Sequence, residues 1–251
     1  QNALNGVYHY VDKIVEYSHD VRNIVLNNRL RIDFSTMSPD FVNSGGRNRP
    51  GTVTCTGLLS AHTKWWTYSD ETLLSVRNRH QSFWSYEGDE VILQGIYDAT
   101  IKLPPVPFDG TYEIRMGYCA MSSRGIVQTY FNGAPCNIPL DLRTLGTDPK
   151  IGWASDADLE NDEEAIMLHD KAMRNRGYMM GIASYKGSSS IFRDLDNMLR
   201  YIITTQYMSS EQDYYLRMRQ VLDNNMAEMQ GDFIEIVPKS VYAGETPEDK
   251  Y

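Results

Sequence analysis

The residues best suited to ligand binding form an aromatic cluster in the first third of the sequence. Trp65 and Trp66 are adjacent and lie in a polar stretch without clear periodicity, together with His62, Lys64 and Tyr68. The C–H faces of sugar rings stack on flat aromatic rings, as nucleic-acid bases do in single-strand binders, and neighbouring polar side chains can hydrogen-bond to the sugar hydroxyls. The cluster therefore predicts carbohydrate binding.

We predict a carbohydrate-binding set that extends beyond this cluster. Its members are Trp65, Trp66, Tyr68, Trp84, Arg124 and Trp153. Trp84 and Trp153 are secondary stacking platforms, and Arg124 can donate hydrogen bonds to hydroxyls from a Ser-Ser-Arg-Gly turn. Adjacent residues of an extended chain point to opposite sides. We therefore expect one of Trp65 and Trp66 in the core and the other available to a ligand.

The sequence contains no recognisable catalytic or nucleotide-binding motif. Its five histidines form neither an HExxH motif nor a close pair, and GxSxG, GxGxxG and Walker sequences are absent. A glycosidase needs two facing carboxyls, and nothing in the sequence selects two of the 33 acidic residues. We predict no catalytic residue, no metal ligand and no cofactor.

An acidic run between Asp156 and Glu164 has the oxygen chemistry of a calcium site but lacks the glycine and spacing of an EF-hand loop. Acids precede basic residues across 155–177, and Gly177 follows, which is typical of a helix with a glycine stop. Ala165, Leu168 and Ala172 form its predicted apolar stripe. Structural calcium stays an unsupported possibility.

Composition narrows the class of protein and of partner. The chain has 251 residues, 41% hydrophobic and 23% charged, and a formal net charge of −9. These values are typical of a folded domain, and the acidity disfavours nucleic acid and anionic lipid. No run reaches the ~20 apolar residues of a membrane span, and the first residues carry no signal-peptide pattern. We interpret the sequence as a fragment of a longer protein.

Short segments with alternating hydrophobicity, separated by turns, dominate the sequence from Thr52 onward. The segment TYEIRMGYCA alternates, and YYLRMRQVL places Leu216 and Met218 on one face against Arg217 and Arg219 on the other. Strands are also predicted at LRYIITTQYM and DFIEIVPKSVY, and Pro104, Pro105 and Pro107 end another one. Such a series without intervening helices predicts a mainly β fold, an antiparallel sandwich or jelly roll.

A glycine-rich and asparagine-rich loop after residue 42 divides the sequence. The predicted domains are an N-terminal appendage over residues 1–45, a β-sandwich over 46–242 and a frayed tail over 243–251. The appendage is predicted to contain a strand over residues 7–15 and a helix over residues 21–32. Of three cysteines, Cys119 and Cys136 fall in strand-like segments; a bridge between them is possible, but buried free thiols are expected.

The segment NGVYHYVDKIV, residues 5–15, resembles the closing strand of a fasciclin domain. The stretch from YDATIKLPPVPFDG through KAMRNRGYM and TTQYM to DFIEIVPKSVY resembles the C-terminal domain of fasciclin-containing surface lipoproteins of Bacteroidetes. This resemblance spans most of residues 15–242. In addition, GTYEIRMGY and RGIVQTYFNG look like paired strands of galactose-binding-like jelly rolls. The first 45 residues then correspond to the end of a truncated fasciclin-like domain and a linking helix.

This resemblance implies a lipid-anchored parent at the cell surface or outer membrane, with a role in adhesion or glycan use. It assigns no binding residue. Our leading hypothesis is a non-catalytic module that binds a polysaccharide or glycan. Alternatives are a structural domain that contacts neighbouring surface lipoproteins, and a glycosidase-like enzyme. An exposed Trp in a pocket with polar groups favours sugar binding, whereas four buried Trp side chains favour the structural role.

Overall fold

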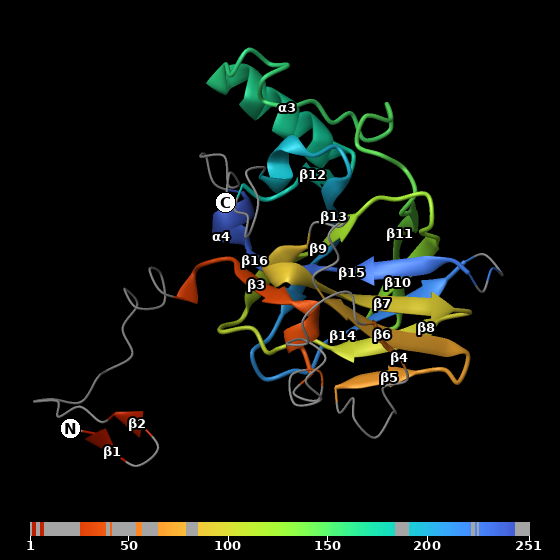
Figure 1. Cartoon of the computed structure of the whole chain (residues 1–251). Coiled ribbons are helices and arrows are strands. Elements are labelled where there is room, and N and C mark those ends of the chain that lie inside the picture. The colour runs from red at the N-terminus through yellow and green to blue at the C-terminus, as the bar shows by residue number, and fades with distance from the viewer. Residues whose placement is uncertain are drawn as a thin grey trace, which may run out of the picture.

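The computed structural model of the chain describes residues 2–3, 6–7, 26–38, 41, 54–56, 65–78, 85–183, 191–221, 224 and 226–243 (Figure 1). Several predicted features lie outside these residues. They are Trp84, the predicted strand beyond Val7, the first part of the helix predicted from residue 21, and the tail from residue 244.

Three antiparallel sheets contain most of the described strands, and we name each after one inner strand. The β8 sheet has the order β11-β10-β14-β8-β5 and comprises β5 (Trp66–Tyr68), β8 (Asp98–Lys102), β10 (Ile126–Phe131), β11 (Ala134–Asp141) and β14 (Tyr215–Gln220). The β9 sheet has the order β12-β13-β9-β16-β3 and comprises β3 (Leu30–Asp33), β9 (Gly110–Cys119), β12 (Tyr178–Met180), β13 (Met198–Met208) and β16 (Phe233–Pro238). The β7 sheet has the order β15-β7-β6-β4 and comprises β4 (Thr54–Thr56), β6 (Thr72–Asn78), β7 (Asp89–Gly95) and β15 (Glu228–Gly231). Strands β1 (Asn2–Ala3) and β2 (Gly6–Val7) pair separately.

The three large sheets share one hydrophobic core. Ile101 of β8, Ile114 of β9 and Leu93 of β7 all belong to it and are almost fully buried. In β14 the predicted alternation is confirmed, because Leu216 is buried and Tyr215 is exposed. Side chains of a strand alternate between faces, so each sheet contributes one apolar face to this core. The predicted antiparallel, mainly β architecture is therefore confirmed.

Helices are few in the described chain. They are α3 (Glu163–Asn175), α4 (Lys239–Tyr242) and the 3-10 turns η2 (Phe34–Thr36), η4 (Tyr86–Gly88) and η5 (Phe192–Asp194). Asp162 caps α3 by accepting a hydrogen bond from the Ala165 backbone N–H at 2.8 Å, and Gly177 follows the helix with a φ of +86°. None of the described helices has the length and apolar character needed to span a membrane.

Three local predictions need correction. Residues 30–32 were expected at the end of a helix of the appendage, but Leu30–Asp33 forms strand β3, which pairs with β16. Helix α3 buries Ile166 and Met173, whereas Leu168 of the predicted stripe is 57% exposed. The strand predicted through Tyr242 ends at Pro238 and continues as α4. For β3, the pairing with β16 overrides the local helical pattern.

The cysteine prediction is confirmed where the structure describes it. Cys119 and Cys136 are both buried, free thiols. Burial raises the pKa of the Cys119 thiol to about 12, so this thiol stays protonated at neutral pH. Neither cysteine forms a disulfide within the described chain.

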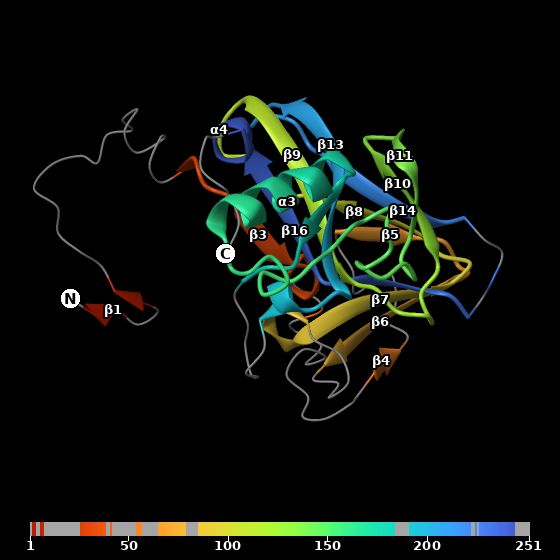
Figure 2. The same cartoon turned by 90° about the horizontal axis from the view of Figure 1, so that it is seen from above.

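Strand β9 is buried on both faces, although its sequence alternation is typical of a half-exposed strand. Its second face carries Glu113 and Arg115, which are covered by helices. Arg174 of α3 donates to Glu113 Oε2 at 2.5 Å, and its guanidinium lies 5.5 Å from the ring centroid of Tyr242 in α4. Figure 2 shows α3 and α4 over the β3–β16–β9 side of the molecule. The helices therefore seal the part of this face of the β9 sheet that carries Glu113 and Arg115.

Glu235 of β16 lies at the centre of this sealed face and is fully buried. Its carboxylate accepts hydrogen bonds from Arg31 Nε at 2.7 Å, and from Arg115 Nη1 and Arg200 Nη1 at 3.3 Å each. Burial alone raises the pKa of a carboxyl. The charges of Arg200, Arg31 and Arg115 outweigh this effect and hold the pKa of Glu235 at about 2. One ionised carboxylate thus connects strands β3, β9, β13 and β16.

Replacing Glu235 by Gln is expected to destabilise the fold. Removing one partner of a buried ion pair leaves uncompensated charge and costs about 3–5 kcal/mol. Because the folded pKa of Glu235 lies below its ordinary 4.5, its stabilisation is present above pH 4.5 and is lost as the pH falls towards about 2. Urea unfolding of both proteins should therefore show a difference at pH 7 that narrows in acid.

The exposed Glu211→Gln substitution is the matched control, and its free energy of unfolding should stay within about 0.5 kcal/mol of the parent chain. Equal stability of Glu235→Gln and the parent chain at pH 7 would contradict the role assigned to the buried carboxylate.

Candidate functional site

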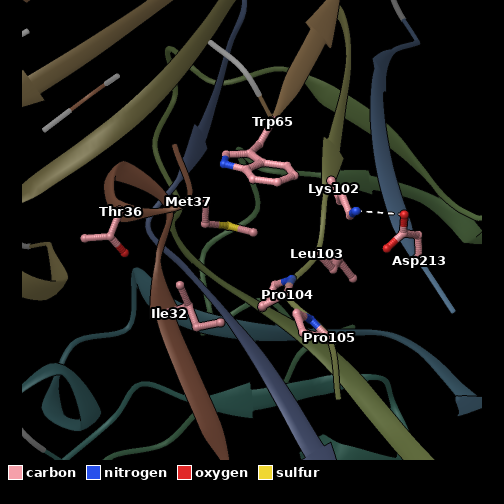
Figure 3. Close-up of a pocket in the computed structure, with 9 residues that line it drawn as sticks. All are labelled: Ile32, Thr36, Met37, Trp65, Lys102, Leu103, Pro104, Pro105 and Asp213. Atoms are coloured by element: carbon pink, nitrogen blue, oxygen red, sulfur yellow. Dashed lines mark ion pairs between the residues drawn. The ribbon is translucent and has the colours of Figure 1, made fainter. Parts of the chain in front are cut away.

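A pocket of about 370 Å³ lies beside Trp65 and joins segments that are far apart in the sequence (Figure 3). We call it the Trp65 pocket. Its walls are formed by Ile32, Thr36, Met37, Trp65, Lys102, Leu103, Pro104, Pro105 and Asp213. Trp65 is 37% exposed, and in Figure 3 it lies opposite Pro104 and Pro105. Mostly apolar walls with a few polar groups are typical of small-ligand sites.

The orientation of Trp65 follows from the burial of its neighbour. Trp66, the first residue of β5, is 3% exposed, and its ring centroid lies 6.0 Å from that of Phe34 and 5.6 Å from that of Phe41. Because successive side chains alternate, Trp65 turns away from the core. A backbone hydrogen bond from Lys102 N–H to the Trp65 carbonyl, at 3.0 Å, holds this position against the end of β8.

Lys102 and Asp213 supply the charged groups of the pocket. Lys102 Nζ lies 2.7 Å from Asp213 Oδ2 and 5.3 Å from the ring centroid of Trp65, which is within cation–π distance. Pro104 and Pro105 lack a backbone N–H and cannot continue the ladder of β8. Just before them, the Leu103 N–H bonds to the Tyr214 carbonyl at 2.8 Å. This contact brings Asp213 next to Lys102.

The remaining polar group comes from the segment after β3. Asp33 caps the turn η2 by accepting a hydrogen bond from the Ser35 N–H at 2.9 Å, and it places Thr36 and Met37 at the pocket wall. Thr36 is exposed, and its hydroxyl donates to the Asp33 carbonyl at 2.8 Å. The Thr36 oxygen therefore retains acceptor capacity for a ligand.

These groups match the requirements of a sugar ring. Trp65 offers a flat, partly exposed face, while the Lys102 ammonium donates hydrogen bonds and the Asp213 carboxylate accepts them. The ion pair and the cation–π contact hold these groups in place before a ligand arrives, which reduces the ordering cost of binding. Trp65 is thus a partly exposed tryptophan in a pocket with polar groups, which is the arrangement named in the exposure criterion for the tryptophans.

The other predicted aromatic residues lie elsewhere. Trp66 is part of the core, and Tyr68, on the same face of β5, packs partly buried against that core. Trp153 is also partly buried against the core, and its Nε1 is buried. Trp84 lies outside the described residues. The structure therefore brings Trp65 alone, among the predicted aromatics that it describes, to the wall of the pocket.

Arg124 is not available to a ligand in this conformation. Its side chain is fully buried, and the guanidinium donates to Glu228 Oε2 at 2.6 Å and to Gln230 Oε1 at 2.7 Å. These partners lie on β15, which Arg124 meets through an isolated bridge to Glu228. Its predicted role as a donor to sugar hydroxyls is therefore corrected to a structural one. A buried guanidinium needs such partners because desolvation of its charge is costly.

A second, more polar pocket of about 270 Å³ lies at the other end of β8. It is lined by Ser69, Glu71, Ile96, Tyr97, Asp98, Arg219, Gln220 and Val221. Tyr97 is fully buried, so this pocket has no exposed aromatic face. Asp98 accepts from Arg217 Nε at 2.6 Å, and this hydrogen bond lowers the pKa of the Asp98 carboxyl. The Trp65 pocket is the better candidate for a stacked ligand.

The acidic run before α3 has structural roles. Asp156 accepts hydrogen bonds from Arg193 Nε at 2.8 Å and from Arg193 Nη2 at 2.7 Å, and Asp162 caps the helix. Among the described residues, no group of three or more acidic, His or Cys side chains is arranged to hold a metal ion. Asp156 and Asp162 of this run therefore have structural roles.

The sequence did not reveal Thr36, Lys102 and Asp213 as pocket residues. Lys102 lies at the end of a predicted strand, and Asp213 precedes another; neither belongs to a motif. The pocket assembles because β8 lies between β5 and β14 in the sheet. The weak signal available in the sequence was the pair of prolines after Lys102, which marks a strand end at a surface.

No protein-family model and no curated protein matches the sequence. Among solved structures, a Paenibacillus xanthan lyase aligns at 12% identity with a TM-score of 0.39, covering 68% of this chain and 12% of the lyase. A Bacteroides uniformis beta-glucuronidase 2 aligns at 10% identity with a TM-score of 0.32, covering 72% of this chain and 15% of that enzyme. The chain thus spans a small part of each. Neither TM-score reaches 0.5, so neither likeness assigns a family or a ligand.

Alanine substitutions should separate the two adjacent tryptophans. Trp66→Ala removes a buried ring and is expected to lower the free energy of unfolding by about 3–5 kcal/mol. Trp65→Ala removes a partly exposed ring and should cost less than about 1 kcal/mol. Urea denaturation of both variants measures the difference. A larger loss of unfolding free energy in Trp65→Ala than in Trp66→Ala would show that Trp65, and not Trp66, is the core residue.

Proposed function

We propose that this chain is a non-catalytic glycan-binding module whose sugar site is the Trp65 pocket. The observation that carries the proposal is the partly exposed Trp65 ring beside the Lys102–Asp213 ion pair, in a pocket of about 370 Å³. A sugar ring stacks on the indole while its hydroxyls bond to the charged pair. The geometry thus meets both needs of sugar recognition, an apolar face and fixed polar groups.

The arrangement of carboxylates supports binding rather than hydrolysis. Glycosidases use two carboxyls about 5–9.5 Å apart, one of which is an acid with a raised pKa. Asp213 is the one carboxylate among the residues that line the Trp65 pocket, and it is ion-paired with Lys102. The second pocket is lined by two carboxylates, Glu71 and Asp98, and the hydrogen bond from Arg217 lowers the pKa of Asp98, which is opposite to the need of a general acid.

The setting of this module follows from the family that the sequence resembles. We propose that the parent protein is a lipid-anchored protein of the cell surface or outer membrane, where glycan binding serves adhesion or glycan use. The alternative, a domain that binds neighbouring lipoproteins without a sugar site, predicts no retention of glycans. A single binding screen separates the two functions.

The screen uses the purified chain on an array of neutral polysaccharides and glycans, followed by calorimetry on the best binder. The parent chain should bind at least one glycan, and Trp65→Ala should weaken that binding by at least about fivefold, because loss of a stacked aromatic ring costs about 1–3 kcal/mol. Asp213→Asn breaks the ion pair and should weaken binding as well.

Tyr207→Ala is the matched control, since Tyr207 is a 67% exposed aromatic on β13 of the β9 sheet; its affinity should equal that of the parent. Failure of the folded chain to retain any glycan would reject the proposed function. Unchanged affinity in folded Trp65→Ala would reject the Trp65 pocket as the site.

A further inference from the structure

The outer face of the β8 sheet carries a band of aromatic and charged side chains that begins at the Trp65 pocket. Lys102 of β8 lies directly opposite Tyr215 of β14, and Arg217 of β14 lies opposite Tyr130 of β10. Residues opposite each other in an antiparallel pair share a face. The inner face is occupied by core residues, so Lys102, Tyr215, Arg217 and Tyr130 all point outward from the sandwich.

This band is accessible and partly rigid. Tyr215 is 42% exposed, and the side chain of Arg217 is 37% exposed. Arg217 is clamped between two neighbours, with its guanidinium 5.1 Å from the ring centroid of Tyr130 and its Nε 2.6 Å from Asp98 Oδ1. The ring of Tyr130 and the planar guanidinium therefore keep a fixed orientation at the surface.

The spacing of the band suits a chain of sugars rather than one sugar. Neighbouring strands lie about 4.8 Å apart. Trp65 is next to β8, Tyr215 is on β14 and Tyr130 is on β10, so the three rings extend across the sheet over roughly 14 Å. Two of these rings, Trp65 and Tyr215, are substantially exposed. A single sugar in the Trp65 pocket cannot contact all three.

Most charges along the band are paired. Lys102 is paired with Asp213 at 2.7 Å, and Asp98 is shared by Arg217 at 2.6 Å and Arg219 at 3.9 Å. The band therefore carries three cations and two carboxylates, and these paired donors and acceptors complement a hydroxyl-rich ligand. A polyanion would meet two carboxylates along the band, on a chain whose overall charge is −9.

We propose that the band is an extended binding platform for one neutral glycan chain, which occupies the Trp65 pocket and continues across β8 and β14 over Tyr215 towards Tyr130. This inference rests on the proposed glycan-binding function and extends it by specifying the ligand class, a neutral polysaccharide chain recognised along its length. Tyr215 is a stacking residue of the second subsite, and the Arg217–Asp98 pair binds hydroxyls there.

The test is a series of calorimetric titrations with hexasaccharides and disaccharides of cellulose, xylan, mannan and laminarin. At least one hexasaccharide should bind about tenfold or more tightly than its disaccharide. Tyr215→Ala should remove this gain and leave disaccharide binding unchanged, while Tyr215→Phe, which keeps the ring, should retain it. Tyr207→Ala serves as the exposed-tyrosine control. Affinity should change less than about twofold between low and high salt, since charge screening acts on net ionic contacts.

Three results would overturn the platform. They are equal affinity for hexasaccharides and disaccharides, undiminished hexasaccharide binding by folded Tyr215→Ala, and tighter binding of an acidic hexasaccharide such as that of polygalacturonic acid. If any of these occurs while Trp65→Ala still weakens binding, the platform fails and the Trp65 pocket stands. If no saccharide binds the folded chain, the proposed function and the platform fail together.

Discussion

The buried carboxylate of Glu235 is the interaction on which the architecture depends. It binds arginines from β3, β9 and β13, and therefore joins residues 31, 115, 200 and 235 on one face of the β9 sheet. Desolvating such charges is costly, and the cost is offset only when every partner is correctly placed. A slip of one residue in β3 or β13 would turn an arginine to the opposite, apolar face. The ionic cluster therefore specifies strand register as well as holding the strands together.

This constraint divides the molecule into a sealed side and an open side. On the β9 sheet, α3 and α4 cover the part of the outer face around Glu113. There Arg174 of α3 donates a hydrogen bond to the Glu113 carboxylate. On the β8 sheet, the outer face keeps its charged pairs at the surface, where Lys102 meets Asp213 and Arg217 meets Asp98. The sealed side supplies rigidity. The open side can present aromatic rings to solvent while β5 stays attached to the core, because Trp66 on the opposite face of β5 packs against Phe34 and Phe41.

Sequence patterns predicted local structure where one face of an element meets solvent. The alternation in 214–221 gave the correct buried and exposed faces of β14, and the Gly177 stop located the end of α3, although the helix begins at Glu163 and not near residue 155. The same rule was insufficient for β9, because alternation cannot show that a helix covers the polar face. Local helix preference also failed at residues 30–32, where pairing with β16, about two hundred residues later, outweighs it.

By itself the sequence determined that the fold is mainly antiparallel β and that Trp65 and Trp66 point to opposite sides. These properties depend on neighbours in the chain, whose side chains alternate by backbone geometry. Only the tertiary structure decided that Trp65 is the outward ring, that Arg124 is buried against Glu228, and that Lys102 and Asp213 complete the pocket. The Arg124–Glu228 and Lys102–Asp213 pairs each join residues more than a hundred positions apart, and Trp66 packs on Phe34 and Phe41 outside its own strand; no local pattern records such contacts.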